Sequence, residues 1–298
     1  MKFDDSNVDA SQVQDLRGGR GGGGPGRGGG MGRGATVGGL GIIGLIMAVF
    51  FGVNVAGNEP EPQFIPTQTQ TQSQTRTGTT MGTGSDLATR CNQPGAIDQY
   101  EDCFITKVFN ETNEIWASQV QGYRRPTLVF FERGVRTACG PASSDTGPFY
   151  CPGDDKVYID LPFMKQLLNR LGANGRNAEA YVIAHEVGHH IQNITGQERR
   201  VRQLQGQDPR NRNALSVRME LQADCYAGVW ARQANEQGKV QITPSELDQA
   251  REAAAAVGDD RINPRLGQEH FTHGSAQQRQ EWFNRGFDSG DPRQCNTF

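Results

Sequence analysis

The sequence predicts an α+β fold, in which a small β-sheet packs on a helix carrying the motif H-E-x-x-H, preceded by one transmembrane helix. Three observations predict it. An uncharged apolar run occupies residues 37–55. Short β-branched and aromatic segments lie between residues 126 and 161, as expected for a small sheet. Most of the chain after residue 162 has the three- and four-residue spacing of apolar side chains that indicates helices.

Composition indicates how many folded domains the chain can form and which kinds of partner it can bind. The chain has 298 residues, a hydrophobic fraction of 35% and a formal net charge of −3, so charge gives no reason to expect a nucleic-acid partner. Glycine is concentrated in the first 60 residues, which cannot build a core, whereas about 200 later residues suffice for one domain. We therefore predict a disordered Gly/Arg-rich cytoplasmic tail at 1–36, an anchor at 37–57, a flexible Pro/Gln/Thr linker at 58–89 and one folded domain at 90–298.

The tail contains Arg17-Gly-Gly-Arg20, which resembles the RGG tracts that can contact RNA. Its basic residues are almost balanced by Asp4, Asp5, Asp9 and Asp15, so a disordered tail without nucleic acid is the favoured interpretation.

The apolar run sets the expected topology. As a helix, residues 37–55 would span roughly 28 Å, enough for a hydrocarbon core. Arg27 and Arg33 precede the run, and Glu59 follows it. The positive-inside rule then predicts a single-pass protein of the cell membrane, with a cytoplasmic N-terminus and an extracytoplasmic (periplasmic or extracellular) domain. The alternative is a signal peptide cleaved near Val55-Ala56-Gly57.

All six cysteines follow the apolar run and none forms a C-x-x-C pair, which favours disulfides in an oxidising compartment over a cysteine metal site. Six cysteines allow 15 connectivities. Proximity in sequence favours Cys91–Cys103 and Cys139–Cys151, which leaves Cys225 with Cys295. Free buried thiols in a cytosolic protein are the alternative.

Local patterns place the elements of the domain. We expect a helix at 96–114, strands at 126–132, 149–151 and 156–161, and a short helix at 162–171. The polar stretch 197–212 is interpreted as a partly helical loop, and a long helix is expected at 213–237. Thr243 and Glu246 form a predicted capping box, which opens a further helix that runs to about residue 257. Ser275 is predicted to cap a last helix, at 275–285.

The chemistry centres on residues 184–190, which contain His185, Glu186 and His189. Two histidines four residues apart share one helix face, so their imidazoles can bind one zinc ion. Glu186 is placed to accept a proton from a metal-bound water. Asn177 is the predicted cap of this helix.

A second helix offers Glu220 and Asp224, again four residues apart. Glu220 can complete a His₂Glu site with one position open for water, and Asp224 can fix the tautomer of a ligand histidine. A solvated carboxylate is the alternative for Glu220 taken alone.

Together, segments 184–190, 220–230 and 271–279 resemble the bacterial neutral zinc metallopeptidase family of the YpfJ type, which belongs with the Glu-zincins. The resemblance covers the chain from about residue 91 to the end. It implies a zincin-like metallopeptidase domain, Zn²⁺ as cofactor and a protein or peptide substrate. In zincins an edge strand before the active helix pairs with substrate, and residues 157–160 lie in the matching place. The alternative for this segment is an ordinary strand inside the sheet.

The resemblance also implies roles for His273 and Arg279, since other membrane-linked Glu-zincins carry Thr-His followed six residues later by Arg near the zinc. Both are expected to face the cleft. His273 would stabilise negative charge on the substrate carbonyl oxygen, and Arg279 would orient His273 or reach the same oxygen. The alternative is a structural role for each. His270 and His190 are predicted to be surface residues without a role.

The predicted function is therefore a membrane-anchored zinc endopeptidase, in which Glu186 assists attack of a zinc-bound water on a peptide carbonyl. Two alternatives remain open at this stage: a non-catalytic, zinc-stabilised interaction module at the membrane, and a zinc hydrolase of non-peptide amide bonds. The sequence leaves the oligomeric state and the natural substrate open.

Overall fold

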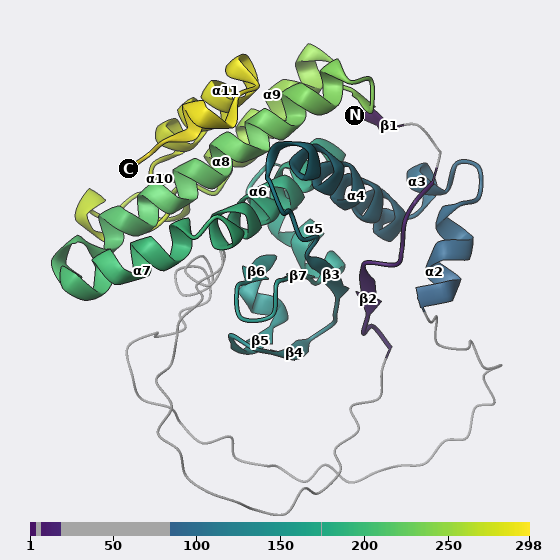
Figure 1. The fold of residues 1–298 in the computed structure, drawn as a ribbon, viewed down its shortest axis with the longest axis horizontal. Coiled ribbons are helices and arrows are strands. Elements are labelled where there is room, and N and C mark those ends of the chain that lie inside the picture. Colours follow the sequence, from purple (N-terminus) through teal and green to yellow (C-terminus); the bar gives the residue numbers. More distant parts are fainter. Residues whose placement is uncertain (4–6, 19–83, 174) are drawn as a thin grey trace, which may run out of the picture.

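The computed structural model describes residues 1–3, 7–18, 84–173 and 175–298, and it combines a helical layer with a four-stranded sheet (Figure 1). The helices are α2 (Gly84–Cys91), α3 (Ala96–Gln99), α4 (Glu101–Gln119), α5 (Leu161–Arg170), α6 (Arg176–Ile194), α7 (Gln197–Gln207), α8 (Arg212–Glu236), α9 (Pro244–Ala256), α10 (Asp259–Ile262) and α11 (Ala276–Ser289). The strands are β1 (Lys2–Phe3), β2 (Val13–Asp15), β3 (Thr127–Phe130), β4 (Gly134–Thr137), β5 (Gly140–Ser143), β6 (Phe149–Cys151), β7 (Lys156–Ile159) and β8 (Val240–Gln241). This mixture confirms the predicted α+β class.

The main sheet has the strand order β2-β3-β7-β6, in which β6 alone runs antiparallel to its neighbour. The prediction that residues 157–160 form an edge strand is wrong, because β7 pairs with β3 on one side and β6 on the other. The turn at 152–155 correctly predicted the β6–β7 hairpin. The pairing of β7 with β3, however, joins segments that no local pattern connects. The edge strand nearest to α6 is β6.

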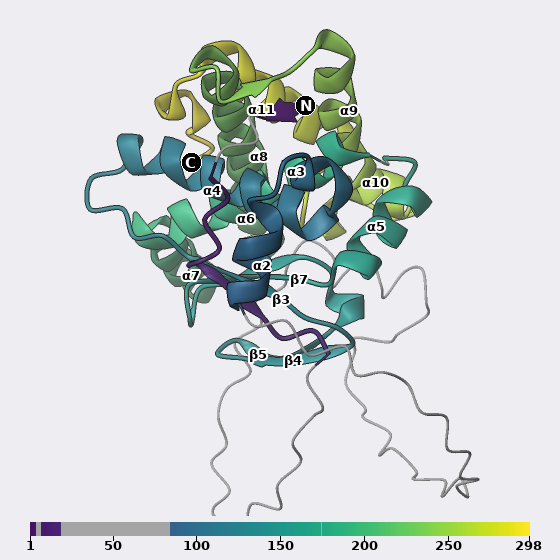
Figure 2. The same ribbon diagram turned by 90° about the vertical axis from the view of Figure 1, so that its right-hand side faces the viewer.

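Alternate residues of the strands build two separate cores, as the period of a strand requires. One face of the sheet packs against the helices and the other against the β4–β5 hairpin, which the sequence analysis did not foresee (Figure 2). The side chains facing the helices include Leu128, Phe130, Val157 and Ile159. Those facing the hairpin include Val129, Phe131, Phe149 and Tyr158.

The first residues of the chain are part of this fold. We call residues 1–3 and 7–18 the N-terminal strap. In the strap, β1 pairs antiparallel with β8, and β2 pairs in parallel with β3 at the edge of the sheet opposite β6 (Figure 1, purple). Phe3 and Val8 are buried in the helical core. The prediction of a disordered tail at 1–36 is therefore wrong for these residues, because pairing with strands more than 100 residues away supplies the order that composition does not.

Two asparagine side chains hold the strap by its backbone. The Asn92 amide accepts from the Val8 N–H at 3.0 Å and donates to the Val8 carbonyl at 3.1 Å. In the same way, Asn110 accepts from the Asp9 N–H at 2.9 Å and donates to the Asp9 carbonyl at 3.0 Å. Each amide thus makes the two bonds that a neighbouring strand would make. These hydrogen bonds hold the strap in place although it buries few apolar side chains.

The helices differ from the prediction in three places. Helix α2 begins at Gly84, inside the predicted linker 58–89. The predicted helix 96–114 is two helices, since the extended backbone of Tyr100 (φ −119°, ψ 123°) separates α3 from α4. The polar stretch 197–212 forms the regular helix α7, followed by a 3₁₀ turn. The predicted caps Thr243 and Ser275 are confirmed, each with a reciprocal capping box.

The structure contains the three predicted disulfides, Cys91–Cys103, Cys139–Cys151 and Cys225–Cys295. The predicted transmembrane helix at 37–57 lies outside the described residues. Within the described part of the chain, every helix is too short or too polar to span a bilayer.

Candidate metal centre

Helix α6 carries the H-E-x-x-H motif through the middle of the domain. It packs against α4, α8, α9 and β6, and His185 and Glu186 in its centre are fully buried. Its approach to α8 depends on Gly188, where an added Cβ would lie 3.1 Å from the Cα of Ala223 and 3.2 Å from its carbonyl oxygen. This close contact brings the Glu220 turn of α8 within reach of both histidines. Helix α6 begins at Arg176, so Asn177 lies in its first turn and is not the predicted cap.

The structure brings the three predicted ligands together. The Nε2 atoms of His185 and His189 are 3.1 Å apart, and the Glu220 carboxylate lies 3.2 Å from the first and 3.5 Å from the second. Ligand atoms about 2.0–2.1 Å from a tetrahedral ion lie about 3.3 Å from one another, so these spacings fit Zn²⁺. A second cluster among the described residues, Cys91, Cys103 and Asp102, has both sulfurs in a disulfide.

Asp224 supports the first ligand. Its Oδ1 accepts from His185 Nδ1 at 2.8 Å, which leaves Nε2 to face Glu220. Arg279 donates two hydrogen bonds to the same carboxylate at 2.8 and 2.9 Å, and the hydroxyl of Tyr181 donates a third. Burial favours a raised pKa for Asp224, but Arg279 and His185 outweigh burial and lower its pKa below the ordinary value. Asp224 is therefore a carboxylate.

The pKa values of the three predicted ligands depend on burial and on the charged groups beside them. Burial opposes charge on Glu220, yet His189 and His185 lower its pKa far below the ordinary value, so it too is ionised. Burial also opposes charge on His185, but Asp224 and Glu220 raise its pKa to about 9. His189 has no carboxylate beside its Nδ1, and burial lowers its pKa. Without a cation, His185 and Arg279 therefore balance the two carboxylates, and a bound cation would replace the proton on His185 Nε2.

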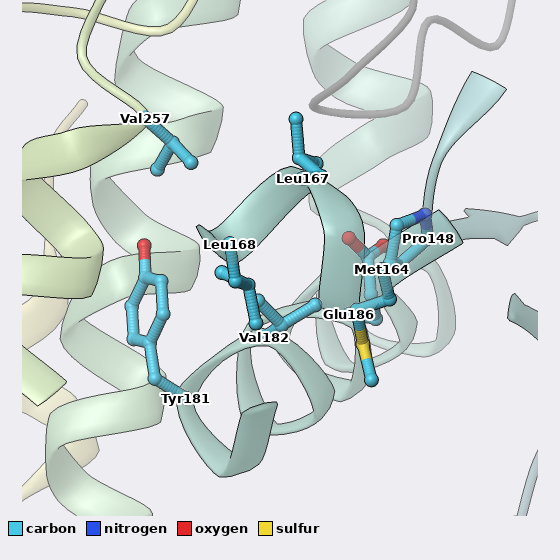
Figure 3. Close-up of a pocket in the computed structure, with 8 residues that line it drawn as sticks. All are labelled: Pro148, Met164, Leu167, Leu168, Tyr181, Val182, Glu186 and Val257. Atoms are coloured by element: carbon cyan, nitrogen blue, oxygen red, sulfur yellow. The ribbon is translucent and has the colours of Figure 1, made fainter. Parts of the chain in front are cut away.

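Glu186 is the exceptional residue of the site. It is fully buried, and neither carboxyl oxygen has a hydrogen-bond partner in the described part of the protein. Burial raises its pKa to about 8, although His185 and the nearby Tyr150 backbone N–H act in the opposite direction. Glu186 also lines a small hollow, together with side chains of α5 and α6 that include Met164 and Val182 (Figure 3). A buried carboxyl group without a partner is costly, so its position indicates a ligand or a reacting group there.

The structure assigns His273 and Arg279 to different places. His273 is 3% exposed, and its charge contributes to lowering the pKa of Glu220, so it lies within electrostatic reach of the ligands. Arg279 is fully buried and directs its donors at Asp224 and at the carbonyl of Val257. The Arg279 guanidinium group also lies 3.8 Å from the carboxylate of Glu220, so it is close to the ligands, but its shorter contacts are with Asp224. That Arg279 faces the cleft stays a prediction.

Asp259 is a site residue that the sequence analysis missed. Its Oδ2 accepts the backbone N–H groups of Thr272, His273 and Gly274 at 2.7–3.0 Å, and its Oδ1 lies 3.2 Å from His273 Nδ1. Burial acts to raise the pKa of Asp259, but these bonds and the charge of His273 lower it. Asp259 therefore orients His273. It precedes His273 by 14 residues, and no local motif marks it.

Gln192 also escaped prediction. Its Oε1 lies 2.8 Å from His189 Nδ1, so a neutral amide supports the second ligand. His190, predicted to be a surface residue, is fully buried: its Nε2 donates to the carbonyl of Arg124 at 2.6 Å and its Nδ1 lies 3.0 Å from the Tyr150 hydroxyl. Burial lowers the pKa of His190. It joins α6 to β6 and takes no part in the ligand set.

Sequence comparisons agree with this geometry. The whole chain, residues 1–298, matches the family model described as "Putative neutral zinc metallopeptidase". The chain belongs to this family. Zn²⁺ is the cofactor that the family implies, and the predicted family and cofactor are thereby confirmed. The matched region includes the N-terminal strap.

The family's other members are similar over most of their length. "Uncharacterized protein YpfJ" of Escherichia coli (strain K12) is 48% identical over 204 residues, which are 65% of this chain and 70% of the relative. "Uncharacterized protein Mb2605" of Mycobacterium bovis and "Uncharacterized protein Rv2575" of Mycobacterium tuberculosis are each 42% identical over 228 residues, which are 72% of this chain and 76% of the relative. No solved structure matches the chain.

Proposed function

We propose that this member of the family is a zinc-dependent endopeptidase in which Glu186 is the general base. The observation that carries the proposal is the buried Glu186 carboxyl group, which lacks a partner and lies beside the three ligands. A structural zinc site uses four protein ligands and needs no base, whereas a catalytic site has three and keeps one position open. The non-catalytic interaction module gives no reason for a residue like Glu186.

His185, His189 and Glu220 would hold the ion. When bound, zinc supplies Lewis acidity toward the substrate carbonyl and lowers the pKa of water. The positive charge of the ion would favour the ionised form of Glu186, whose pKa burial otherwise raises. The Glu186 carboxylate would then accept a proton from the attacking water and deliver it to the leaving amine. Its burial excludes competing bulk water, which strengthens this proton transfer.

His273 and Arg279 have different roles, one direct and one indirect. His273, oriented by Asp259, stabilises the negative charge that develops on the carbonyl oxygen. Arg279 acts indirectly, since it holds Asp224 and through Asp224 the ring of His185.

Strand β6 is the proposed docking edge for the substrate backbone. Among the described residues, β6 pairs only with β7, so it ends the sheet on the side of α6. The Tyr150 backbone N–H is close enough to Glu186 to affect its pKa, which places this edge beside the reacting groups. An extended peptide added to β6 would lie along the base and the ligands.

The test uses the purified full-length chain and an unfolded protein as substrate. We expect cleavage that stops when a chelator removes the metal and returns with added Zn²⁺. The Glu186→Gln variant should bind zinc and fail to cleave. Absence of proteolysis with activity on small N-acyl amides would instead support the non-peptide hydrolase.

A further inference from the structure

We propose that Gln192 and Gln222 form a hydrogen-bonded relay that fixes the tautomer of His189, and that the Cys225–Cys295 disulfide holds the end of this relay. Gln192 and Gln222 are thus positioning residues for the second zinc ligand. This inference rests on the proposed function, in which His189 holds zinc.

The relay runs from α6 through α8 to the C-terminus. His189 Nδ1 is 2.8 Å from Gln192 Oε1. The Gln192 amide nitrogen donates to the carbonyl of Met219 at 2.7 Å and to Gln222 Oε1 at 3.1 Å. The Gln222 amide nitrogen in turn donates to the carbonyl of Cys295 at 2.9 Å. Three hydrogen bonds therefore connect the second ligand to the 3₁₀ turn Pro292–Cys295, and the bond to Met219 anchors Gln192 between them.

Two backbone carbonyls set the direction of every bond in this relay. A carbonyl can only accept, so Gln222 must direct its amide nitrogen at Cys295 and its oxygen at Gln192. The Met219 carbonyl similarly selects the amide nitrogen of Gln192, which leaves the Gln192 oxygen for His189. That oxygen can only accept, so Nδ1 of His189 carries the proton. The lone pair of His189 is then on Nε2, which faces His185 and Glu220.

Because the relay is buried, the loss of one of its hydrogen bonds should be costly. Gln192 is fully buried, Gln222 is 6% exposed and Cys295 is 1% exposed, so water cannot easily replace a lost partner. The two ligand histidines also differ in their support. His185 donates to the carboxylate of Asp224, whereas His189 donates to a neutral amide that must itself be held in place.

The disulfide holds the last acceptor. Cys225 lies three residues after Gln222 on α8, so both side chains share one face of that helix. Its bond to Cys295 ties the 3₁₀ turn Pro292–Cys295 to this face and keeps the Cys295 carbonyl at Gln222. Beyond the disulfide, Thr297 donates to the carbonyl of Arg218 at 2.8 Å and holds the turn more weakly. The affinity for zinc should therefore depend on this disulfide.

The first experiment measures zinc affinity of the full-length chain by competition with a chromophoric chelator. Gln192→Met removes the acceptor at nearly constant shape and should weaken zinc binding about 10- to 100-fold. Gln222→Met should weaken it less, because the Met219 carbonyl still holds Gln192. The control is Gln233→Met. Gln233 lies on α8, like Gln222, and its side-chain amide donates to the Gly290 carbonyl at 2.7 Å. This control variant should leave affinity unchanged.

The second experiment reads the tautomer without metal. Imidazole ¹⁵N shifts of the folded, zinc-free chain should show the proton of His189 on Nδ1 in the wild type. A mixture of tautomers is expected in Gln192→Met, while Gln233→Met should match the wild type. Wild-type zinc affinity and an unchanged tautomer in Gln192→Met would overturn the proposal.

The third experiment compares two disulfides. Cys225→Ala/Cys295→Ala and Cys91→Ala/Cys103→Ala should both lower thermal stability, but only the first should weaken zinc binding, by a factor similar to that of Gln222→Met. If the two folded variants bind zinc equally well, the Cys225–Cys295 disulfide does not support the relay. If Cys225→Ala/Cys295→Ala fails to fold, the zinc affinity of Gln222→Met tests the same end of the relay. A wild-type chain that binds no zinc overturns both the relay and the proposed function, whereas zinc binding insensitive to Gln192→Met overturns the relay alone.

Discussion

Asp224 Oδ1 lies 2.8 Å from His185 Nδ1, and this hydrogen bond joins α8 to the first histidine of the motif on α6. Arg279 occupies the other side of the same carboxylate, and all three groups are fully buried. Such an arrangement is sensitive to the loss of any member, because a remaining charge is left without a partner in a medium of low polarity.

Substitutions of Glu220 and Asp224 should therefore have different effects. Glu220→Ala removes a ligand and should abolish tight zinc binding with a modest change in stability. Asp224→Ala leaves the buried Arg279 charge with only the more distant Glu220 carboxylate, at 3.8 Å, so we expect a loss of up to about 3–5 kcal/mol in the free energy of unfolding. Asp224→Asn should fold better and bind zinc about 10- to 100-fold more weakly than the wild type. Metal titration and thermal melts check this, and wild-type zinc affinity for Glu220→Ala would refute the ligand assignment.

Replacement of the base should separate binding from turnover. Glu186→Gln keeps all three ligands and nearly the same volume but cannot accept a proton. Zinc content should stay near normal, while turnover should fall by about 10²–10⁴-fold. Metal analysis and single-turnover peptide cleavage provide the measurement. If turnover persists at the wild-type level, Glu186 is not the base.

His273→Ala should lower turnover by about 10²–10³-fold with little change in zinc content. The reason is that His273 acts on developing charge and is not needed to hold the ion. Asp259→Asn is the matched variant, since it keeps an acceptor for the backbone N–H groups but weakens the orientation of the ring. It should lower turnover less. Loss of zinc in His273→Ala would make His273 a ligand, and normal activity per folded molecule would make its role structural.

Glu179 should make stability depend on pH independently of the metal. Burial raises the pKa of this carboxyl group on α6 to about 7 from 4.5, and nearby Glu101 adds to the effect. Between these values the folded state binds more protons than the unfolded state, so the free energy of unfolding falls as pH rises from 4.5 through 7. Glu179→Gln should therefore stabilise the chain by roughly 1–3 kcal/mol at pH 8 and by much less at pH 5. Thermal melts at both pH values check this, and an equal gain at both would contradict it.

The motif helix, the ligands and the caps could be predicted because each depends on residues three or four apart. His185 and His189 share a helix face whatever the rest of the chain does, and so do Glu220 and Asp224. The disulfides Cys91–Cys103 and Cys139–Cys151 close loops with a separation of 12 residues, which sequence proximity suggests.

The supporting residues could not be predicted, because tertiary contacts create their roles. Gln192 is one glutamine among many until α8 places Gln222 and the Met219 carbonyl beside it. Asp259 gains its role only when the turn at His273 folds back onto it. The N-terminal strap is the extreme case, since Val13 pairs with Leu128. The strap is charged and is followed by a glycine-rich stretch, so its sequence did not indicate that it pairs with β3.

This pairing of β2 with β3 constrains more than the sheet. Hydrogen bonds between adjacent strands reach only about 3 Å and cannot be made across a bilayer whose hydrocarbon core is about 30 Å thick. In any molecule that contains this sheet, the N-terminal strap and the described residues from 84 onward therefore lie on the same side of a bilayer. A single crossing of the membrane by residues 37–57 would divide them between two. The four-stranded sheet and a single-pass topology are thus mutually exclusive states of one chain.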